Sequence, residues 1–295
     1  MDMPLVSICL LTYMHERYIE DCLRGVLNQT YENMEIIILD DYSIDNTFTI
    51  IQNTKSLLSK KFVRVVIEQN KKNTGNISQN MNRMIRFAKG EYIKPITGDD
   101  IMKSCCIKRM VSCMEFHPDR LMCYANTYVI DERYRYGDKP GSECFYKNHK
   151  AYPQKEIFQQ LMKLCYVSPS ILVRSKMYEK YGNYDEMIYY EDYDMWLRIG
   201  REEEFLYIPQ KLEYYRRSIN SKTNYKTKGG ESRFLWMLKE EQKVIKKHLL
   251  GVSDTEKKVY IDYFYDRFIW SAKNAGLWRL AIGLGIKKRC EGKKK

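Results

Sequence analysis

The feature that most constrains the fold is a pair of short apolar runs that enclose a helical pattern. Residues 5–11 (LVSICLL) and 34–39 (MEIIIL) are too short for independent helices, so each is expected to form a buried parallel strand. Between them, residues 18–27 carry apolar side chains at helical spacing, namely Ile19, Cys22, Leu23, Val26 and Leu27. A strand, a helix and a second strand in this order predict a right-handed crossover unit.

The same alternation continues along the chain. Residues 62–68 and 91–96 predict two more strands, and residues 77–88 predict a helix that stops at Lys89-Gly90. The polar, glycine-containing stretch 134–151 is expected to be a loop. The later patterns predict helices at 154–164, at 175–181 and from 191, a strand at 170–173, and a helical region over 233–285. The fold class is therefore α/β: a Rossmann-like, mostly parallel sheet flanked by helices, with a helical C-terminal extension.

Polar side chains follow three of the predicted strands. Ligands of doubly wound sheets bind at the carboxyl ends of the strands, so binding groups are expected at these positions. They are Thr12, Tyr13 and Glu16 after the first strand, Asp40 and Asp41 after the second, and Asp99 and Asp100 after the fourth. One aspartate at a strand end is usually a turn former or a helix cap, but three carboxylate-bearing loops together favour a site.

Two acidic pairs point to chemistry. Adjacent carboxylates such as Asp99 and Asp100 suit Mg²⁺ or Mn²⁺, because these ions prefer oxygen ligands and also bind the phosphate oxygens of nucleotides. Glu191 and Asp192 stand at the expected start of a helix, where a carboxylate could serve as general base toward a hydroxyl. An acidic first turn favoured by the helix dipole explains this second pair equally well.

Composition bounds the partners. Residues 231–295 hold 16 Lys or Arg against 8 Asp or Glu, so this segment carries +8 of the formal net charge of +12. No zinc-finger or RNP-type motif accompanies the charge, so specific nucleic-acid binding is not expected. The mixture of aromatic and basic residues over 264–289 suits a helix on an anionic membrane surface or one packed on its own domain. Nine cysteines without a C-x-x-C pair, and a start without a signal pattern, predict reduced thiols in a cytoplasmic protein.

Three stretches carry a family resemblance. They are residues 5–47 (LVSICLLTYMHERYIEDCLRGVLNQTYENMEIIILDDYSIDNT), 73–100 (NTGNISQNMNRMIRFAKGEYIKPITGDD) and 191–199 (EDYDMWLRI). In this order they resemble the family-2 glycosyltransferases of GT-A fold, of the type found in bacterial polysaccharide biosynthesis. The resemblance extends over about residues 4–222. It implies a catalytic domain over residues 1–222 and a helical, basic region over residues 223–295.

The resemblance also implies a reaction. A member of this family would be an inverting enzyme that uses Mn²⁺ or Mg²⁺ and moves a sugar from a nucleoside-diphosphate donor, UDP-sugar first among them. The acceptor would be a hydroxyl of a glycan or lipid-linked molecule in cell-surface polysaccharide synthesis. Such an enzyme is expected in the cytoplasm, with its basic C-terminal region available for peripheral contact with the inner face of the plasma membrane.

Site residues follow from the same resemblance, position by position. Asp192, with Glu191 beside it, matches the catalytic base, and Asp99, with Asp100 beside it, matches the metal-binding motif. Contacts to the nucleotide and its phosphates are implied for Thr12, Tyr13, Glu16, Asp40, Asp41, Asp99 and Arg216.

Three positions depart from the family pattern. Thr97 replaces the first acidic residue of the D-x-D motif, Met81 replaces a common arginine, and Ser218 stands near the place of a frequent histidine. These changes leave open an inactive homologue that only binds nucleotide sugars. The sequence is also compatible with a nucleotidyltransferase, although such an enzyme would normally open with a glycine-rich basic phosphate loop. A basic protein that associates with nucleic acid through nonspecific charge is the third reading that stays open.

Overall fold

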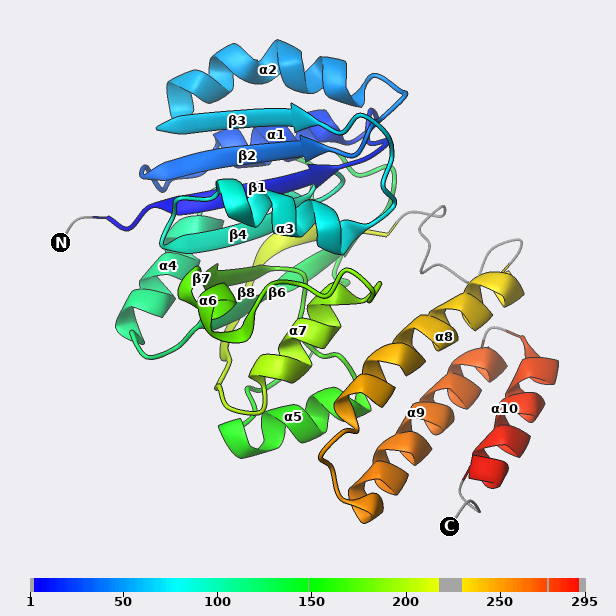
Figure 1. Cartoon of the computed structure of the whole chain (residues 1–295). Coiled ribbons are helices and arrows are strands. Elements are labelled where there is room, and N and C mark those ends of the chain that lie inside the picture. Colours follow the sequence, from blue (N-terminus) through cyan, green and yellow to red (C-terminus); the bar gives the residue numbers. More distant parts are fainter. Residues whose placement is uncertain (1–2, 148, 218–229, 275, 292–295) are drawn as a thin grey trace.

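The computed structural model describes residues 3–147, 149–217, 230–274 and 276–291, and Figure 1 shows their arrangement. The strands are β1 (Val6–Thr12), β2 (Met34–Asp40), β3 (Arg64–Gln69), β4 (Tyr92–Thr97), β5 (Ile101–Met102), β6 (Met122–Ile130), β7 (Ile171–Arg174) and β8 (Leu206–Arg216). The helices are α1 (Ile19–Leu27), α2 (Thr47–Lys61), α3 (Ile77–Phe87), α4 (Cys106–Phe116), α5 (Gln154–Lys163), α6 (Lys176–Tyr181), α7 (Glu191–Ile199), α8 (Gly230–His248), α9 (Asp254–Asn274) and α10 (Trp278–Glu291).

The described strands form one sheet in the order β3-β2-β1-β4-β7-β6-β8-β5. Strands β1 to β4 run parallel to one another, which confirms the predicted crossover units. Strand β7 runs antiparallel to β4 and β6, and β8 lies parallel to β6. The predicted α/β class is confirmed, although the sequence patterns do not predict β5, β6, β8, α2 or α4.

Each face of the sheet has its own hydrophobic core, because successive side chains of a strand point to opposite faces. In β1, Val6, Ile8 and Leu10 pack with helices α1, α2 and α4. Cys9 and Leu11 point the other way and join the core that helices α3 and α5 to α10 build. Both faces are covered, and this explains why the two N-terminal apolar runs are continuous rather than alternating.

The sheet curls because of a very short connection. Only three residues, Gly98 to Asp100, separate β4 from β5, yet β5 lies four strand positions away from β4. Four residue steps reach at most about 14 Å, whereas four strand spacings measure about 19 Å. The far edge of the sheet is therefore drawn back toward the end of β4, and the end of β8 meets the Asp99–Asp100 turn there.

Helices α8, α9 and α10 form the C-terminal part of the molecule and lie to one side of the sheet (Figure 1). Phe234, Leu238, Val244 and Phe264 from these helices share a hydrophobic core with Trp196 of α7. The expected boundary between residues 222 and 223 lies outside the described residues. No described helix is long and apolar enough to cross a membrane.

Candidate active site

The end of β1 supplies the first group of expected nucleotide contacts. Thr12 is buried, and its Oγ1 lies 3.3 Å from Nδ1 of His15. Tyr13 projects from the protein with 44% of its surface exposed. Glu16 is held away from this point, because its Oε2 accepts hydrogen bonds from the backbone and side-chain N–H groups of Asn46, at 3.1 and 3.2 Å. His15 was not among the expected site residues, although it belongs to the same strand-end loop.

The end of β2 holds two buried aspartates with different partners. Asp40 accepts hydrogen bonds from the backbone N–H and the hydroxyl of Ser43 and so closes the turn that follows the strand. Asp41 accepts hydrogen bonds from Asn70, Thr74 and the backbone N–H of Gly75. Asp41 therefore ties the end of β2 to the loop that precedes α3, and both carboxylates organise the loops around this strand end.

The turn after β4 separates two aspartates of different character. Asp99 keeps a quarter of its side chain exposed, and its Oδ1 lies 3.9 Å from Nε2 of His15. Asp100 is buried, and its two oxygens accept hydrogen bonds from the backbone N–H of Arg216 at 2.8 Å and from the Thr97 hydroxyl at 3.0 Å. Burial, and next the negative charge of Asp99, raise the pKa of Asp100 well above its usual range. Asp99 thus faces the open site while Asp100 anchors the turn.

Arg216, at the end of β8, fastens this turn from the other side. Its Nε donates to the backbone carbonyl of Asp99 at 2.9 Å, and its Nη1 donates to the carbonyls of Asp131 and Tyr134. The guanidinium lies over the ring of Tyr18, 4.6 Å from the centroid. Its Nη2 is buried and lacks a hydrogen-bond partner among the described residues. Nη2 is thus the one nitrogen of the Arg216 guanidinium without a partner in the described structure. Ser218 lies outside the described residues.

Glu191 and Asp192 form the first turn of α7, and both side chains are half-buried. Asp192 Oδ1 accepts a hydrogen bond from the backbone N–H of Tyr193 at 2.6 Å. Burial raises the pKa of Asp192, and burial together with the charge of Asp192 raises the pKa of Glu191 well above its usual range. Two carboxylates that share one apolar surrounding resist double ionisation, which is a common property of acid–base sites.

Tyr215 links the two acidic groups in space. Burial is the main cause that raises the pKa of its hydroxyl, and the negative charges of Asp100, Asp99 and Asp192 each add to the effect. All three carboxylates therefore lie within electrostatic range of one side chain, although they come from sequence segments about ninety residues apart. Sequence reasoning missed Tyr215 because β8 carries no recognisable strand pattern.

Other buried polar residues support the site from behind. Lys94 of β4 and Glu213 of β8 form an ion pair that is almost completely buried between the two strands that lead to the Asp99 turn and to Arg216. Met81 packs in the core of the α3 face. Its neighbour Asn82 exchanges hydrogen bonds with the backbone of Tyr184, in the loop that leads to α7. At the position where the family commonly has an arginine, this chain therefore has a methionine that packs in the core.

The residues at the Asp99 turn fit a divalent cation in a limited way. The oxygens of Asp99 have no hydrogen-bond partner among the described residues, whereas both oxygens of Asp100 are used inside the protein. Within the described part of the chain, no group of three or more His, Cys, Asp or Glu side chains could hold an ion by itself. The donor set suits a hard cation that takes most of its other ligands from water and from a bound diphosphate.

Solved structures of two glycosyltransferases match nearly the whole chain. TarS 1–349 of S. aureus, in complex with UDP-GlcNAc, is 15% identical with a TM-score of 0.59, and the match covers 97% of this chain and 89% of that one. In another structure of TarS the match spans 54% of that chain, about half its length. The mannosyltransferase PcManGT from Pyrobaculum calidifontis, in complex with GDP-Man and Mn²⁺, is 10% identical with a TM-score of 0.56, and the match covers 100% and 89%. The molecule therefore has the GT-A glycosyltransferase fold with a helical C-terminal part.

Sequence comparison places the chain more closely. Residues 7–182 match the model of glycosyl transferase family 2. An uncharacterized glycosyltransferase of Methanocaldococcus jannaschii is 29% identical over 233 residues, which cover 76% of this chain and 74% of the relative. This chain belongs to glycosyltransferase family 2, as the sequence resemblance indicates, and it is accordingly a glycosyltransferase.

Proposed function

We propose that this chain is an inverting glycosyltransferase in which Asp192 deprotonates a hydroxyl of the acceptor. The observation that carries the proposal is that Asp99, Asp100 and Asp192 all act electrostatically on Tyr215, whose chain neighbour Arg216 bonds to the Asp99–Asp100 turn. A partly exposed carboxylate suited to a cation that binds a diphosphate and a carboxylate suited to proton removal would then share one site. The sugar carbon would react between them.

The proposed reaction is a single displacement. The acceptor oxygen forms a bond to the anomeric carbon as its proton passes to the Asp192 carboxylate. The bond between that carbon and the diphosphate oxygen breaks on the opposite face, and its electron pair leaves with the diphosphate. The raised pKa of Asp192 makes it a better proton acceptor than an ordinary aspartate. The free Nη2 of Arg216 would donate to the departing phosphate and stabilise its charge.

The nucleotide is proposed to bind across the ends of β1, β2 and β4, at Thr12, Tyr13, Asp41 and Asp99. In this arrangement Asp40, through both oxygens, and Glu16, through Oε2, shape the loops. The oxygens of Asp41 also have partners within the protein, so Asp41 would exchange one of them for the nucleotide. Asp99 would hold Mn²⁺ or Mg²⁺, with Asp100 fixing the turn beside it. The bound cation supplies positive charge to the diphosphate. A UDP-sugar donor is favoured by the likeness to a structure that contains UDP-GlcNAc.

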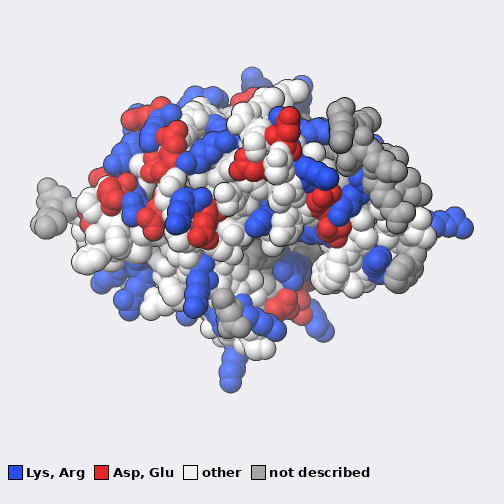
Figure 2. All heavy atoms as spheres, turned by 90° about the horizontal axis from the view of Figure 1, so that it is seen from below, with Lys and Arg blue, Asp and Glu red and all other residues white. Residues whose placement is uncertain are grey.

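The acceptor is proposed to be a glycan or a lipid-linked molecule of cell-surface polysaccharide synthesis. Helices α9 and α10 expose Trp270 and Ile282, at 67% and 64%, near the exposed Lys273 and Arg279. This combination supports peripheral contact with an anionic membrane in the cytoplasm. On the face seen in Figure 2, basic and acidic side chains are interspersed, so we expect apolar contact to contribute alongside charge. Sedimentation with vesicles of anionic lipid, compared for the unchanged chain and Trp270→Ala, tests this contact.

Donor turnover tests the main proposal. The intact chain is incubated with UDP-, GDP- and dTDP-sugars, with and without Mn²⁺, beside the variants Asp99→Ala and Asp192→Asn. Asp119→Asn, at an exposed position before β6, is the matched control. We expect one donor to be used, with loss of turnover in the two site variants and not in the control. If no donor is turned over and no nucleotide binds in the presence of Mn²⁺, the proposal is wrong.

A further inference from the structure

The third acidic residue of α7, Asp194, has no part in the proposed reaction, yet it is the most enclosed of the three. Its side chain is completely buried, whereas Glu191 and Asp192 remain half-buried. Residues two apart on a helix point about 200° away from each other. Asp192 therefore faces the proposed site, and Asp194 faces the opposite side of α7, toward α8.

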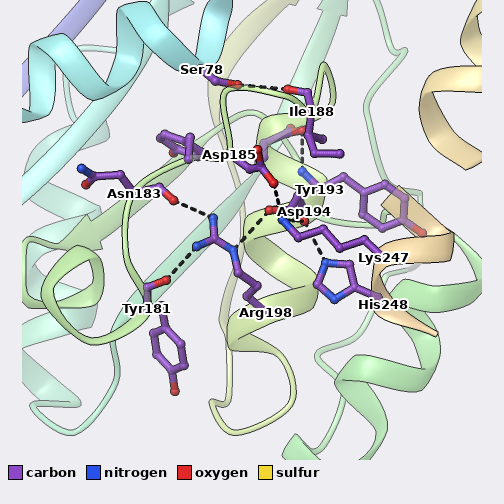
Figure 3. Close-up of polar contacts among 12 residues, drawn as sticks. Ser78, Tyr181, Asn183, Asp185, Ile188, Tyr193, Asp194, Arg198, Lys247 and His248 are labelled. Carbon is purple, nitrogen blue, oxygen red and sulfur yellow. Dashed lines mark hydrogen bonds and ion pairs between the residues drawn. The ribbon is translucent and has the colours of Figure 1, made fainter. Parts of the chain in front are cut away.

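Three basic side chains surround the Asp194 carboxylate (Figure 3). Its Oδ1 lies 2.8 Å from Nζ of Lys247 and 2.9 Å from Nε2 of His248, both at the end of α8. Its Oδ2 lies 3.2 Å from Nε of Arg198, one turn further along α7. Two of the three bases thus come from the C-terminal helices, and they reach a buried acid on the helix that carries the proposed catalytic base.

The same contacts extend to the loop before α7. Nζ of Lys247 also lies 2.7 Å from Asp185 Oδ2, and Arg198 donates to the backbone carbonyls of Tyr181 and Asn183. This loop is held on its other side by α3, where the Ser78 hydroxyl donates to the carbonyl of Ile188 (Figure 3). Lys247 therefore bridges both the loop that enters α7 and the helix itself.

The end of α8 is fixed at its backbone as well. Arg201, two residues after α7 ends, donates through Nη2 to the backbone carbonyl of His248 at 2.8 Å. The last carbonyls of a helix lack partners within the helix, so a guanidinium at this place satisfies one of them and complements the helix dipole. Contacts in both directions, from α8 to Asp194 and from Arg201 to α8, join the two helices.

We propose that Asp194, which contacts Lys247 and His248, is a positioning residue. Through these contacts the C-terminal helices fix the orientation of α7 and therefore that of Asp192. A buried carboxylate between fixed bases resists both rotation and translation of its helix, because either movement would leave a buried charge unpaired. Asp192 lies on the same rigid turn, so it keeps its direction only while Asp194 is held. This inference rests on the proposed role of Asp192.

The most direct variant is Lys247→Met, which keeps most of the length of the side chain and removes its charge. Lys247 is one-third exposed, so α8 is expected to stay folded without its charge. Lys243→Met is the matched control: it lies one turn earlier on α8 and pairs only with Glu240 of the same helix in the described structure. Lys247→Arg, which keeps the charge, tests rescue, and Asp194→Asn tests the acidic partner.

Two measurements on the full chain separate this inference from the proposed function. Hydrogen exchange over residues 191–199 is expected to accelerate about tenfold in Lys247→Met and Asp194→Asn, and to stay unchanged in Lys243→Met and Lys247→Arg. In donor turnover with Mn²⁺, kcat is expected to fall by about 10²-fold in the first two variants, with an unchanged KM for the donor, since small misplacement of a reacting group has this effect.

The inference is overturned if exchange over α7 is the same in Lys247→Met and in Lys243→Met, or if exchange accelerates while kcat stays at the level of the control. A purely structural role would raise KM for the donor together with the loss of kcat, and this also contradicts it. If the unchanged chain turns over no donor at all, the proposed function fails, while the exchange experiment still decides whether α8 holds α7.

Discussion

At the scale of single residues, the surroundings of Asp192 set the pH range of the proposed reaction. Burial raises the pKa of this carboxylate, and only its ionised form can accept a proton. We expect kcat to fall on the acid side at a pH above the ordinary aspartate value of about 3.9. Asp192→Asn should lower kcat by roughly 10²–10⁴-fold and remove this acid limb. A pH series of donor turnover, with UDP binding measured in parallel to show intact folding, checks both expectations.

Tyr42, directly after Asp41, carries backbone strain. It has a φ of 65° although it is not glycine, whereas Tyr13, equally exposed at 44%, has no positive φ. A non-glycine residue in the left-handed region costs roughly 1–2 kcal/mol of folding free energy. Replacing it with glycine removes this cost but loses about 0.5–1 kcal/mol, because glycine has more conformational freedom in the unfolded chain. We therefore expect Tyr42→Gly to raise the free energy of unfolding by roughly 0.5–1 kcal/mol and Tyr13→Gly to lower it. Urea unfolding of both variants measures the difference; equal destabilisation would contradict the strain.

Residue positions in the site divide into those that sequence can predict and those it cannot. The sequence predicts that Thr12, Asp41 and Asp99 lie at or just after strand ends, because short apolar runs mark where the strands stop, and the structure places them there. The different tasks of Asp99 and Asp100 could not be predicted, since they depend on the Arg216 backbone N–H, which reaches Asp100 only through folding of a distant strand. Two adjacent aspartates thus have different roles because one of them contacts a residue more than a hundred positions away in the sequence.

At the scale of secondary-structure elements, β8 shows why three of the eight described strands were not predicted. Its sequence, LYIPQKLEYYR, contains Pro209, and proline within a run normally argues against a strand. The structure accommodates it at an irregularity, because Ala125 pairs with Ile208 and the next residue, Asn126, pairs with Lys211. Pro209 falls in the skipped interval, where no ladder hydrogen bond is required of it. Pairing with β6 and β5, rather than local propensity, makes this segment a strand.

The contact between α7 and α8 gives the stability of the protein a specific dependence on pH. Burial would raise the pKa of Asp194, but His248, Lys247 and Arg198 outweigh it and lower that pKa below its ordinary value. A carboxylate with a lowered folded-state pKa stabilises the protein above the unfolded pKa of about 3.9, and this contribution disappears as the pH falls through the folded value.

Asp194→Asn should therefore lower the free energy of unfolding by roughly 3–5 kcal/mol at neutral pH, since it leaves buried bases unpaired. The difference from the unchanged protein should shrink as the pH falls below about 4. Urea unfolding at several pH values measures it, with Asp254→Asn, at a position that is 97% exposed, as the control. A difference that does not depend on pH would show that packing, not charge, explains the loss.

At the scale of the whole molecule, we propose a catalytic part over residues 1–222 and a helical part over 223–295 that completes the catalytic part's core. Phe234, Val244 and Phe264 are buried in the same core as Leu161 and Trp196. We expect a chain of residues 1–222 to expose this apolar surface, bind a hydrophobic dye and lose cooperative thermal unfolding. Calorimetry of the shortened chain checks this, and a sharp transition near that of the full chain would show two independent units.

The three-residue turn between β4 and β5 has a consequence for how this family can vary. The turn closes a curled sheet and presents Asp99 at the same time, so its length is fixed by geometry as well as by chemistry. The long connection 131–153 between β6 and α5 is not part of this step from β4 to β5. We expect relatives that differ in acceptor to differ in the length of that connection. Relatives with a longer turn between β4 and β5 are expected to lose enzymatic activity. A variant with one additional glycine after Gly98 tests this expectation: it should bind nucleotide more weakly and unfold at a lower temperature than the unchanged chain.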